Sequence, residues 1–212
     1  YSRAVPKDLQ PGDIVERYRV ESTLGEGGTA RVYRVRHPTL ETVHALKVLT
    51  LDHPNIRSRL IDEGKAQAKL MHPHIVHVHD VLEHQGVPAL LMDFVPGHSL
   101  AHHLQDAFPD DTEVRRLFRS IVEGVEFAHS RGLVHRDIKP GNVLLDQSVD
   151  PAVAKVTDFG LVRLLDDPEG TPRRTGVGIS MGTPGYMAPE QLRDAQSADE
   201  RTDIFALGAT LY

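Results

Sequence analysis

The sequence lacks cysteine, long apolar runs and a strong excess of either charge. Without cysteine, the chain cannot form a disulfide scaffold, a zinc–thiolate site or a thiol nucleophile. No apolar run approaches the roughly 18 residues that a membrane-spanning helix needs, and the amino end has no signal-peptide-like stretch. We therefore predict no membrane segment within this chain. A cytoplasmic location fits these absences, and a longer parent protein could be membrane-anchored elsewhere.

The charge balance also argues against some partners. There are 24 Lys and Arg against 30 Asp and Glu, which gives a net charge of −6 with neutral histidine. Surfaces that grip nucleic acid or anionic lipid carry excess positive charge, so we expect no nucleic-acid partner. The 212 residues are 40% apolar and 25% charged, which is ordinary for a globular protein. That length allows one large domain or two small lobes.

Both ends of the chain are unusual. It begins with Tyr1 rather than an initiator Met, and it stops at Tyr212 inside an apolar, helix-compatible run. Natural termini are usually polar and loosely held. We therefore expect both ends to be cut edges of a longer protein.

Residue patterns predict an α+β protein with a β-rich first lobe and a mainly helical second lobe. Alternating or β-branched runs indicate strands, and apolar residues at helical spacing indicate helices. The expected strands cover residues 18–24, 30–36, 42–49, 76–82, 87–95, 143–145 and 153–156, and the expected helices cover 56–71 and 114–128. Residues 1–17 are predicted to be a linker, followed by lobes at 18–95 and 96–212, the second incomplete after its last residue.

A glycine-rich segment, Gly25 to Val32, separates the first two expected strands. Closely spaced glycines let backbone N–H groups approach an anion without interference from side chains. The segment lacks the Gly-Lys-Ser/Thr of the Walker loop, and a strand rather than a helix follows it, unlike the Rossmann fingerprint. It therefore predicts either a different phosphate cradle or an ordinary glycine-rich hairpin turn.

A lysine and a glutamate occupy expected apolar faces. Alternation places Lys47 on one strand face with Val43 and Ala45. Glu63 falls on the apolar stripe of the next helix, where a carboxylate is costly unless it meets a cation. We therefore predict an ion pair between Lys47 and Glu63. The alternative is a lysine at the strand edge whose amine reaches solvent.

The most informative stretch runs from His135 to Val143, and Asp158-Phe159-Gly160 follows after another short apolar run. With the glycine-rich segment, the strand lysine, the helix glutamate and Ala188-Pro189-Glu190 in the same order, these motifs resemble the protein kinase family. The resemblance covers residues 18–212 and implies a two-lobed protein-kinase fold. One departure is Ala30, which stands where the family's glycine loop has its third glycine.

The resemblance implies a role for each group in phosphoryl transfer. Asp137 would accept the proton of the substrate hydroxyl, and Lys139 would sit beside the transferring phosphoryl group. Asn142 and Asp158 would hold Mg²⁺, or alternatively Mn²⁺. Lys47, held by Glu63, would bind the α- and β-phosphates of ATP.

The resemblance also implies an ATP pocket in the cleft between the lobes. Val32 and Ala45 would lie above the adenine and Leu144 below it. Met92 would guard the back of the pocket, and the backbone of residues 93–95 would hydrogen-bond the base. The implied nucleotide-binding residues are Leu24, Gly25, Glu26, Gly27, Gly28, Val32, Ala45, Lys47, Met92, Asp93, Val95, Asn142, Leu144 and Asp158.

Arg136 precedes the expected base, and relatives with this arginine are commonly regulated by phosphorylation of the activation loop. The hydroxyls available in this loop are Thr171, Thr175 and Ser180, with Thr175 favoured because it follows two arginines. The alternative is an unmodified, solvated loop.

Lys139 and Gly182-Thr183-Pro184 resemble the serine/threonine branch of the family. The sequence of the catalytic loop, Ile138 to Asn142, resembles that of bacterial members. The expected function is transfer of the ATP γ-phosphoryl group to Ser or Thr of protein substrates in signalling, with autophosphorylation in a dimer. The alternative is a pseudokinase that binds nucleotide or partners without phosphotransfer. The resemblance also pairs Glu190 with an arginine beyond the chain, so the piece by itself could be inactive.

Overall fold

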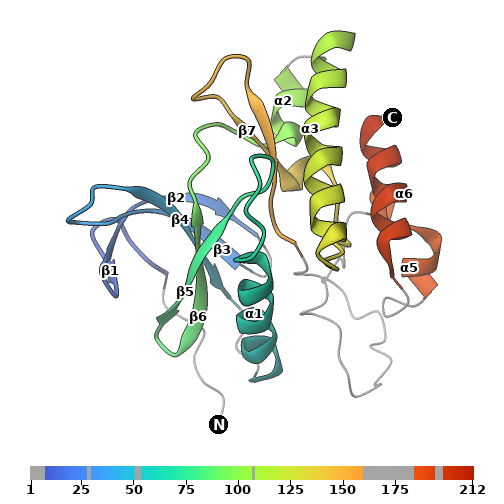
Figure 1. The fold of residues 1–212 in the computed structure, drawn as a ribbon. Coiled ribbons are helices and arrows are strands. Elements are labelled where there is room, and N and C mark those ends of the chain that lie inside the picture. The colour runs from blue at the N-terminus through green and yellow to red at the C-terminus, as the bar shows by residue number, and fades with distance from the viewer. Residues whose placement is uncertain (1–7, 28–29, 51–53, 107, 160–183, 194–197) are drawn as a thin grey trace. The chain divides into compact units, whose positions relative to one another are not determined.

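The computed structural model describes residues 8–27, 30–50, 54–106, 108–159, 184–193 and 198–212 (Figure 1). The chain divides into two compact units, residues 1–69 with 77–94 and residues 70–76 with 95–212. The first unit is rich in strands and the second in helices, as predicted.

The first unit is built on a six-stranded antiparallel sheet with the strand order β1-β2-β3-β4-β6-β5. Its strands are β1 (Ile14–Val15), β2 (Tyr18–Glu26), β3 (Ala30–Arg36), β4 (Val43–Leu49), β5 (Val78–His84) and β6 (Val87–Asp93). Alternation along the strands buries one face as a core, in which Val35 and Leu46 are fully inaccessible. The predicted strands are therefore present, although β5 begins two residues later than expected.

Helix α1 (Pro54–Gln67) packs against β5 and β6, which Figure 1 shows as a green-blue helix beside the sheet. It begins at Pro54, a residue suited to the first helical turn, and ends four residues before the predicted end at residue 71. A Cβ atom at Gly64 would lie 2.8 Å from Val81 Cγ2 and 3.0 Å from Leu90 Cδ2. Gly64 therefore allows the helix to approach the sheet closely.

The predicted linker, residues 1–17, contains strand β1, which the residue pattern did not indicate. β1 pairs with β2, and Leu9 and Val15 are buried in the core of the first unit, at 4% and 1% exposure. Gly12 has a φ of 97° and donates its N–H to the carbonyl of Val20. The glycine that suggested a linker thus forms a turn that folds this segment back onto the sheet.

The second unit is organised around the 20-residue helix α3 (Asp111–Ser130). Asp110 caps its first turn by accepting the N–H of Glu113 at 2.8 Å, and Gly132, with a φ of 73°, follows its last turn. The other elements are α2 (Leu100–Asp106), the 3₁₀ helices η1 (Pro140–Asn142) and η2 (Pro184–Tyr186), the hairpin β7 (Val143–Asp146) with β8 (Val153–Val156), α5 (Pro189–Arg193) and α6 (Glu200–Leu211). Helix α3 packs against both β8 and α6 around a shared apolar core.

Residues 70–76 belong to the second unit, although we predicted them in the first lobe. Ile75 bridges Val156, whose carbonyl accepts the N–H of Val76 at 2.9 Å. These backbone contacts hold the segment beside β8. Within the part of the chain that the structure describes, no helix has the length and apolar character needed to cross a bilayer.

Candidate active site

In the first unit, Lys47 lies in the middle of β4, a central strand of the sheet. The register pairs it with Val32 on β3 and Leu90 on β6, and it pairs Ala45 with Met92. Residues opposite one another in antiparallel strands project to the same face, so these side chains share one face of the sheet. Lys47 is only 7% exposed. The side chain is therefore held at a defined place among apolar neighbours.

Helix α1 packs on the same face of the sheet as Lys47. The position of a Cβ on Gly64 lies next to Leu90, which is the register partner of Lys47. Glu63 precedes Gly64 on this helix, but its side chain is outside the described part of the structure. The ion pair between Lys47 and Glu63 therefore stays a prediction.

The glycine-rich segment forms the end of the β2–β3 hairpin. The register pairs Gly25 with Val32, and Gly27 donates its N–H to the carbonyl of Ala30 at 2.9 Å. A Cβ on Gly25 would meet nothing within 4 Å, and one on Gly27 would meet only the Ala30 oxygen at 3.5 Å. Packing within the unit therefore does not require glycine at these two positions. Close approach of a ligand to the backbone would require it. Gly28 lies outside the described residues.

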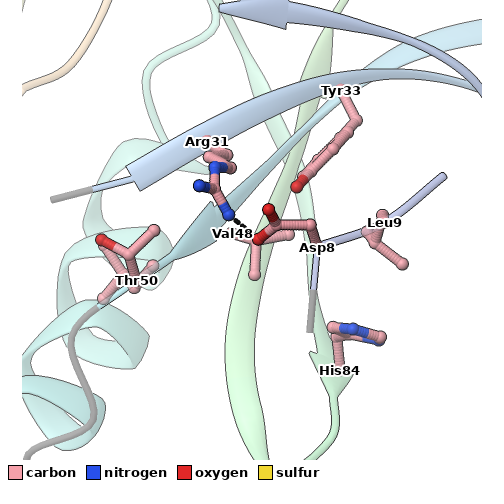
Figure 2. A pocket seen from close by; sticks show the side chains of 8 residues that line it. Asp8, Leu9, Arg31, Tyr33, Val48, Thr50 and His84 are labelled. Atoms are coloured by element: carbon pink, nitrogen blue, oxygen red, sulfur yellow. Dashed lines mark ion pairs between the residues drawn. The ribbon is translucent and has the colours of Figure 1, made fainter. Parts of the chain in front are cut away.

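Arg31 connects the hairpin to the amino-terminal segment. Its guanidinium contacts Glu26 Oε1 at 2.6 and 2.9 Å and forms a second ion pair with Asp8, which Figure 2 shows at the edge of a small pocket. Tyr33, Val48 and other residues line the same pocket. These pairs are accessible to solvent, since Glu26 is 63% and Asp8 50% exposed. They tie the end of the hairpin to a segment that we predicted to be a linker.

The remaining predicted nucleotide contacts of the first unit differ in exposure. Leu24, Gly25, Glu26 and Gly27 are exposed, Val32 and Asp93 are partly buried, and Ala45 and Met92 are buried. The Asp93 carboxylate accepts the N–H of His77 at 3.3 Å and lies 2.7 Å from His79 Nε2. These contacts fix the end of β6, where the backbone is predicted to meet the adenine.

In the second unit, the side chains of the predicted catalytic loop converge on Asp137. Lys139 donates from Nζ to Asp137 Oδ2 at 2.8 Å, and Asn142 donates from Nδ2 to the same oxygen at 2.9 Å. Asn142 also donates to the Asp137 carbonyl at 2.7 Å. Asp137 and Lys139 are each about one-fifth exposed, at 21% and 23%. The carboxylate is therefore oriented by two donors while it stays accessible to a substrate.

His135 is fully buried and supports the catalytic loop through both nitrogens of its ring. Its Nδ1 accepts the N–H of Asp137 at 3.2 Å, and its Nε2 lies 2.8 Å from the carbonyl of Thr157. A carbonyl can only accept, so Nε2 is the donor in this contact. The ring also packs 4.6 Å from that of Phe159. His135 is thus a structural residue that positions the loop through its ring.

Asp203 on α6 anchors the same loop and was not identified from the sequence. Its carboxylate is fully buried and accepts the backbone N–H groups of His135 and Arg136, each at 2.7 Å. It also contacts His129 of α3 at 2.7 Å, and this hydrogen bond raises the pKa of the imidazole above its ordinary value. A carboxylate on the apolar stripe with Ala206 and Leu207 was the available signal, the same one that identified Glu63.

The β7–β8 hairpin brings the two predicted metal ligands together. Asn142 directly precedes β7, and Asp158 follows β8 by two residues. The antiparallel register pairs Val143 with Val156, and Thr157 donates its N–H to the Asn142 carbonyl at 2.9 Å. Amide and carboxylate oxygens are ligands that Mg²⁺ prefers, and substrate phosphates usually complete its shell. These two residues therefore fit such a cation, although the described residues contain no cluster of three or more His, Asp or Glu suited to a metal.

The remaining predicted site residues divide into three that the structure describes and three that it does not. Leu144 is partly buried on β7, Val95 is buried, and Arg136 is partly buried with a φ of 68°. Thr171, Thr175 and Ser180 lie outside the described residues, so their regulatory role stays a prediction.

Comparisons with known proteins identify the family of this chain. Residues 18–212 match the model of the family described as protein kinase domain. The chain is 38% identical over 211 residues to the serine/threonine-protein kinase PknF of Mycobacterium tuberculosis, covering 96% of this chain and 44% of the relative. It is 39% identical over 210 residues to the DNA damage-responsive serine/threonine-protein kinase RqkA of Deinococcus radiodurans, covering 96% of this chain and 30% of that protein.

Solved structures give the same result for the fold. The kinase domain of Mycobacterium tuberculosis PknI matches with a TM-score of 0.76 and 31% identity, covering 96% of this chain and 76% of that one. Rad53 residues 1–466, solved in complex with AMP-PNP, matches with a TM-score of 0.72 and 27% identity, covering 93% of this chain and 47% of that one. The chain thus spans less than half the length of the two curated relatives described above.

Proposed function

Because the chain belongs to the protein kinase family, we propose that it transfers the γ-phosphoryl group of ATP to Ser or Thr hydroxyls of protein substrates. The observation that carries this proposal is the convergence of Lys139 Nζ and Asn142 Nδ2 on one oxygen of Asp137. That arrangement orients a carboxylate beside a cation, as in-line attack on a phosphoryl group requires.

Asp137 is the group that we assign to the substrate hydroxyl. Both donors contact Oδ2, so Oδ1 is the oxygen that would accept the proton as the hydroxyl oxygen attacks. A new bond forms between the hydroxyl oxygen of the substrate and the γ-phosphorus, and the bond from phosphorus to the bridging oxygen of ADP breaks. Lys139 would neutralise charge on the transferring group, which is the main way that proteins accelerate this reaction.

Residues from both units would bind the nucleotide, each with a separate role. Lys47 would bind the α- and β-phosphates, and its low exposure at the centre of the sheet favours a fixed position. Gly25 and Gly27 would leave backbone N–H groups open to phosphate oxygens. Asn142 and Asp158 would hold Mg²⁺, which neutralises phosphate charge when bound. Mn²⁺ as a substitute, autophosphorylation in a dimer and a cytoplasmic location stay predictions.

Phosphoryl transfer can be measured with labelled ATP, Mg²⁺ and a general acceptor protein, with the natural full-length protein as enzyme. Asp137→Asn should lower kcat by about 10²- to 10⁴-fold, because the amide cannot accept the proton. Asp106→Asn is a matched control, since Asp106 is 66% exposed on α2 and outside the site. Equal labelling by the wild type and by Asp137→Asn would contradict the proposal, and phosphotyrosine as the only product would contradict the assigned acceptor.

The role of Lys47 can be tested in the same assay. Lys47→Met should lower kcat/KM for ATP while the fold is kept, since methionine fills a similar volume among the apolar neighbours. Lys69→Met is the control, because Lys69 is exposed and outside the assigned nucleotide contacts. Equal effects of the two substitutions would exclude the assigned phosphate contact.

A further inference from the structure

We propose that Gln191 is a positioning residue for the catalytic loop, whose position it fixes relative to helix α5. This inference rests on the proposed kinase function and adds a residue to which the family motifs assign no role. Gln191 lies on α5, is only 7% exposed, and donates from Nε2 to the carbonyl of Arg136 at 2.7 Å. The two residues are 55 positions apart in the sequence.

The bond with Gln191 fixes the peptide group directly before Asp137. The carbonyl of Arg136 and the N–H of Asp137 belong to the same peptide plane. Gln191 holds the oxygen of that plane, and His135 Nδ1 accepts its N–H at 3.2 Å. A plane that is held at both polar atoms cannot rotate without breaking one of the two bonds. The direction in which Asp137 leaves the backbone is therefore set by Gln191 together with His135.

Arg136 itself needs such support. Its φ of 68° places it in the left-handed region, which is unfavourable for any residue with a Cβ atom. Asp203 accepts its N–H at 2.7 Å, and Gln191 holds its carbonyl. Two buried side chains from separate helices, α5 and α6, thus hold both backbone polar groups of this residue. Because a carbonyl accepts only, the amide nitrogen of Gln191 is the atom that must face it.

The first experiment separates positioning from packing in the natural full-length protein. Gln191→Met keeps the length and volume of the side chain but removes the donor. We expect kcat to fall on the order of tenfold, the equivalent of one hydrogen bond, while KM for ATP stays within about twofold. Arg193→Met introduces the same side chain at an exposed position of α5 and should leave kcat unchanged. An unchanged kcat in Gln191→Met, or equal losses in both variants, would overturn the proposal.

A second substitution gives a pH signature that a packing role would not produce. In Gln191→Glu the ionised carboxylate repels the carbonyl of Arg136, whereas the protonated carboxyl can donate to it. The kcat of this variant relative to wild type should therefore rise as the pH falls from 8 to 6. A ratio that does not change with pH would count against the bond.

Amide hydrogen exchange tests the same contact without an activity assay. Loss of the Gln191 bond should free the Arg136–Asp137 peptide, so a fragment covering residues 135–138 should exchange about tenfold faster in Gln191→Met than in Arg193→Met. Unchanged exchange would refute the positioning role even if the protein transferred no phosphate. Absence of transfer in the wild type, together with faster exchange in the variant, would instead refute the proposed function alone.

Discussion

The two units anchor their functional segments in different ways. In the first unit, the end of the glycine-rich hairpin is tied by Arg31 to Glu26 and Asp8, which are 63% and 50% exposed. In the second unit, the catalytic loop is held by Asp203, which is fully buried, and by Gln191, which is 7% exposed. Exposed ion pairs contribute about 0–1 kcal/mol, whereas buried hydrogen bonds to a charged group contribute more.

This difference matches what each segment would have to do in a kinase. A hairpin that covers a nucleotide must open when the product leaves, and exposed ion pairs can break at little cost. A catalytic carboxylate must keep its direction through every turnover, so its loop benefits from buried contacts. Substitutions in the two units can test this contrast.

The buried anchor of the second unit should be the most sensitive position. Asp203→Asn leaves one oxygen to serve donors from His135, Arg136 and His129, and it turns an NH₂ group toward at least one of them. We expect the free energy of unfolding to fall by about 2–4 kcal/mol, because buried donors lose their acceptor. Urea denaturation followed by circular dichroism would measure this loss.

Asp199 provides the control on the same helix. It caps the first turn of α6, where asparagine is as good a cap as aspartate, so Asp199→Asn should change stability far less than Asp203→Asn. If Asp203→Asn were no more destabilising than Asp199→Asn, the anchoring role of the buried carboxylate would be wrong.

The sequence indicated the candidate site residues more readily than the residues that support the catalytic loop. Strand alternation placed Lys47 among apolar neighbours, where the structure has it, and the family motifs pointed to Asp137 and Asn142. Asp203 was missed because it lies 68 residues from His135, and no local pattern states which loop a buried carboxylate will meet. Gln191 was missed because a single amide on a short helix has no distinctive spacing.

The errors in the fold have a related cause. The segment with Leu9 reads as a linker because its proline and glycine are typical of both linkers and turns. Only the sheet that it meets decides between them, and that sheet is formed by residues further along the chain.

The family match confirms the resemblance to protein kinases, and the α+β architecture is also confirmed.

Two helical glycines allow the same comparison in the packing of each unit. A Cβ on Gly64 of α1 would meet Val81 at 2.8 Å, and a Cβ on Gly124 of α3 would meet the backbone oxygen of His74 at 2.8 Å. Gly64→Ala should destabilise by about 1 kcal/mol, since flexible side chains can shift. Gly124→Ala should cost about 2–3 kcal/mol, since a backbone oxygen cannot move without moving residues 70–76.

Gly208 of α6 is the control for both substitutions. A Cβ there would meet nothing within 4 Å, so Gly208→Ala should stabilise by about 0.5–1 kcal/mol through helix propensity. Thermal unfolding of the three variants would measure the series. A gain in stability from Gly124→Ala would show that α3 does not approach the 70–76 segment as closely as described.

Two histidines should give the units opposite responses to pH. The hydrogen bond from Asp203 raises the pKa of His129 above 6.5, so its stabilising effect is complete below pH 6.5 and is lost as the pH rises through the raised value. Burial, followed by repulsion from His79, lowers the pKa of His44 below 6.5. The unfolded chain then binds the proton more readily, so stability falls as the pH drops below 6.5.

Urea unfolding between pH 5 and 8 would separate these two contributions. His129→Gln should lose most stability relative to wild type at the acid end, because the amide still donates to Asp203 but carries no charge. His44→Gln should remove part of the decline at acid pH. Parallel pH profiles for wild type and both variants would rule out this linkage.

The exposed anchor of the first unit should give the smallest effect on stability. Asp8→Asn removes one of the two ion pairs of Arg31 (Figure 2), and we expect a loss of less than about 1 kcal/mol because both partners are in contact with solvent. The remaining pair with Glu26 still joins the two strands at the end of the hairpin. The loss should shrink further at 1 M salt, where screening acts within about 3 Å. A loss as large as that of Asp203→Asn would remove the contrast between the two units, since the hairpin would then be fixed as firmly as the catalytic loop.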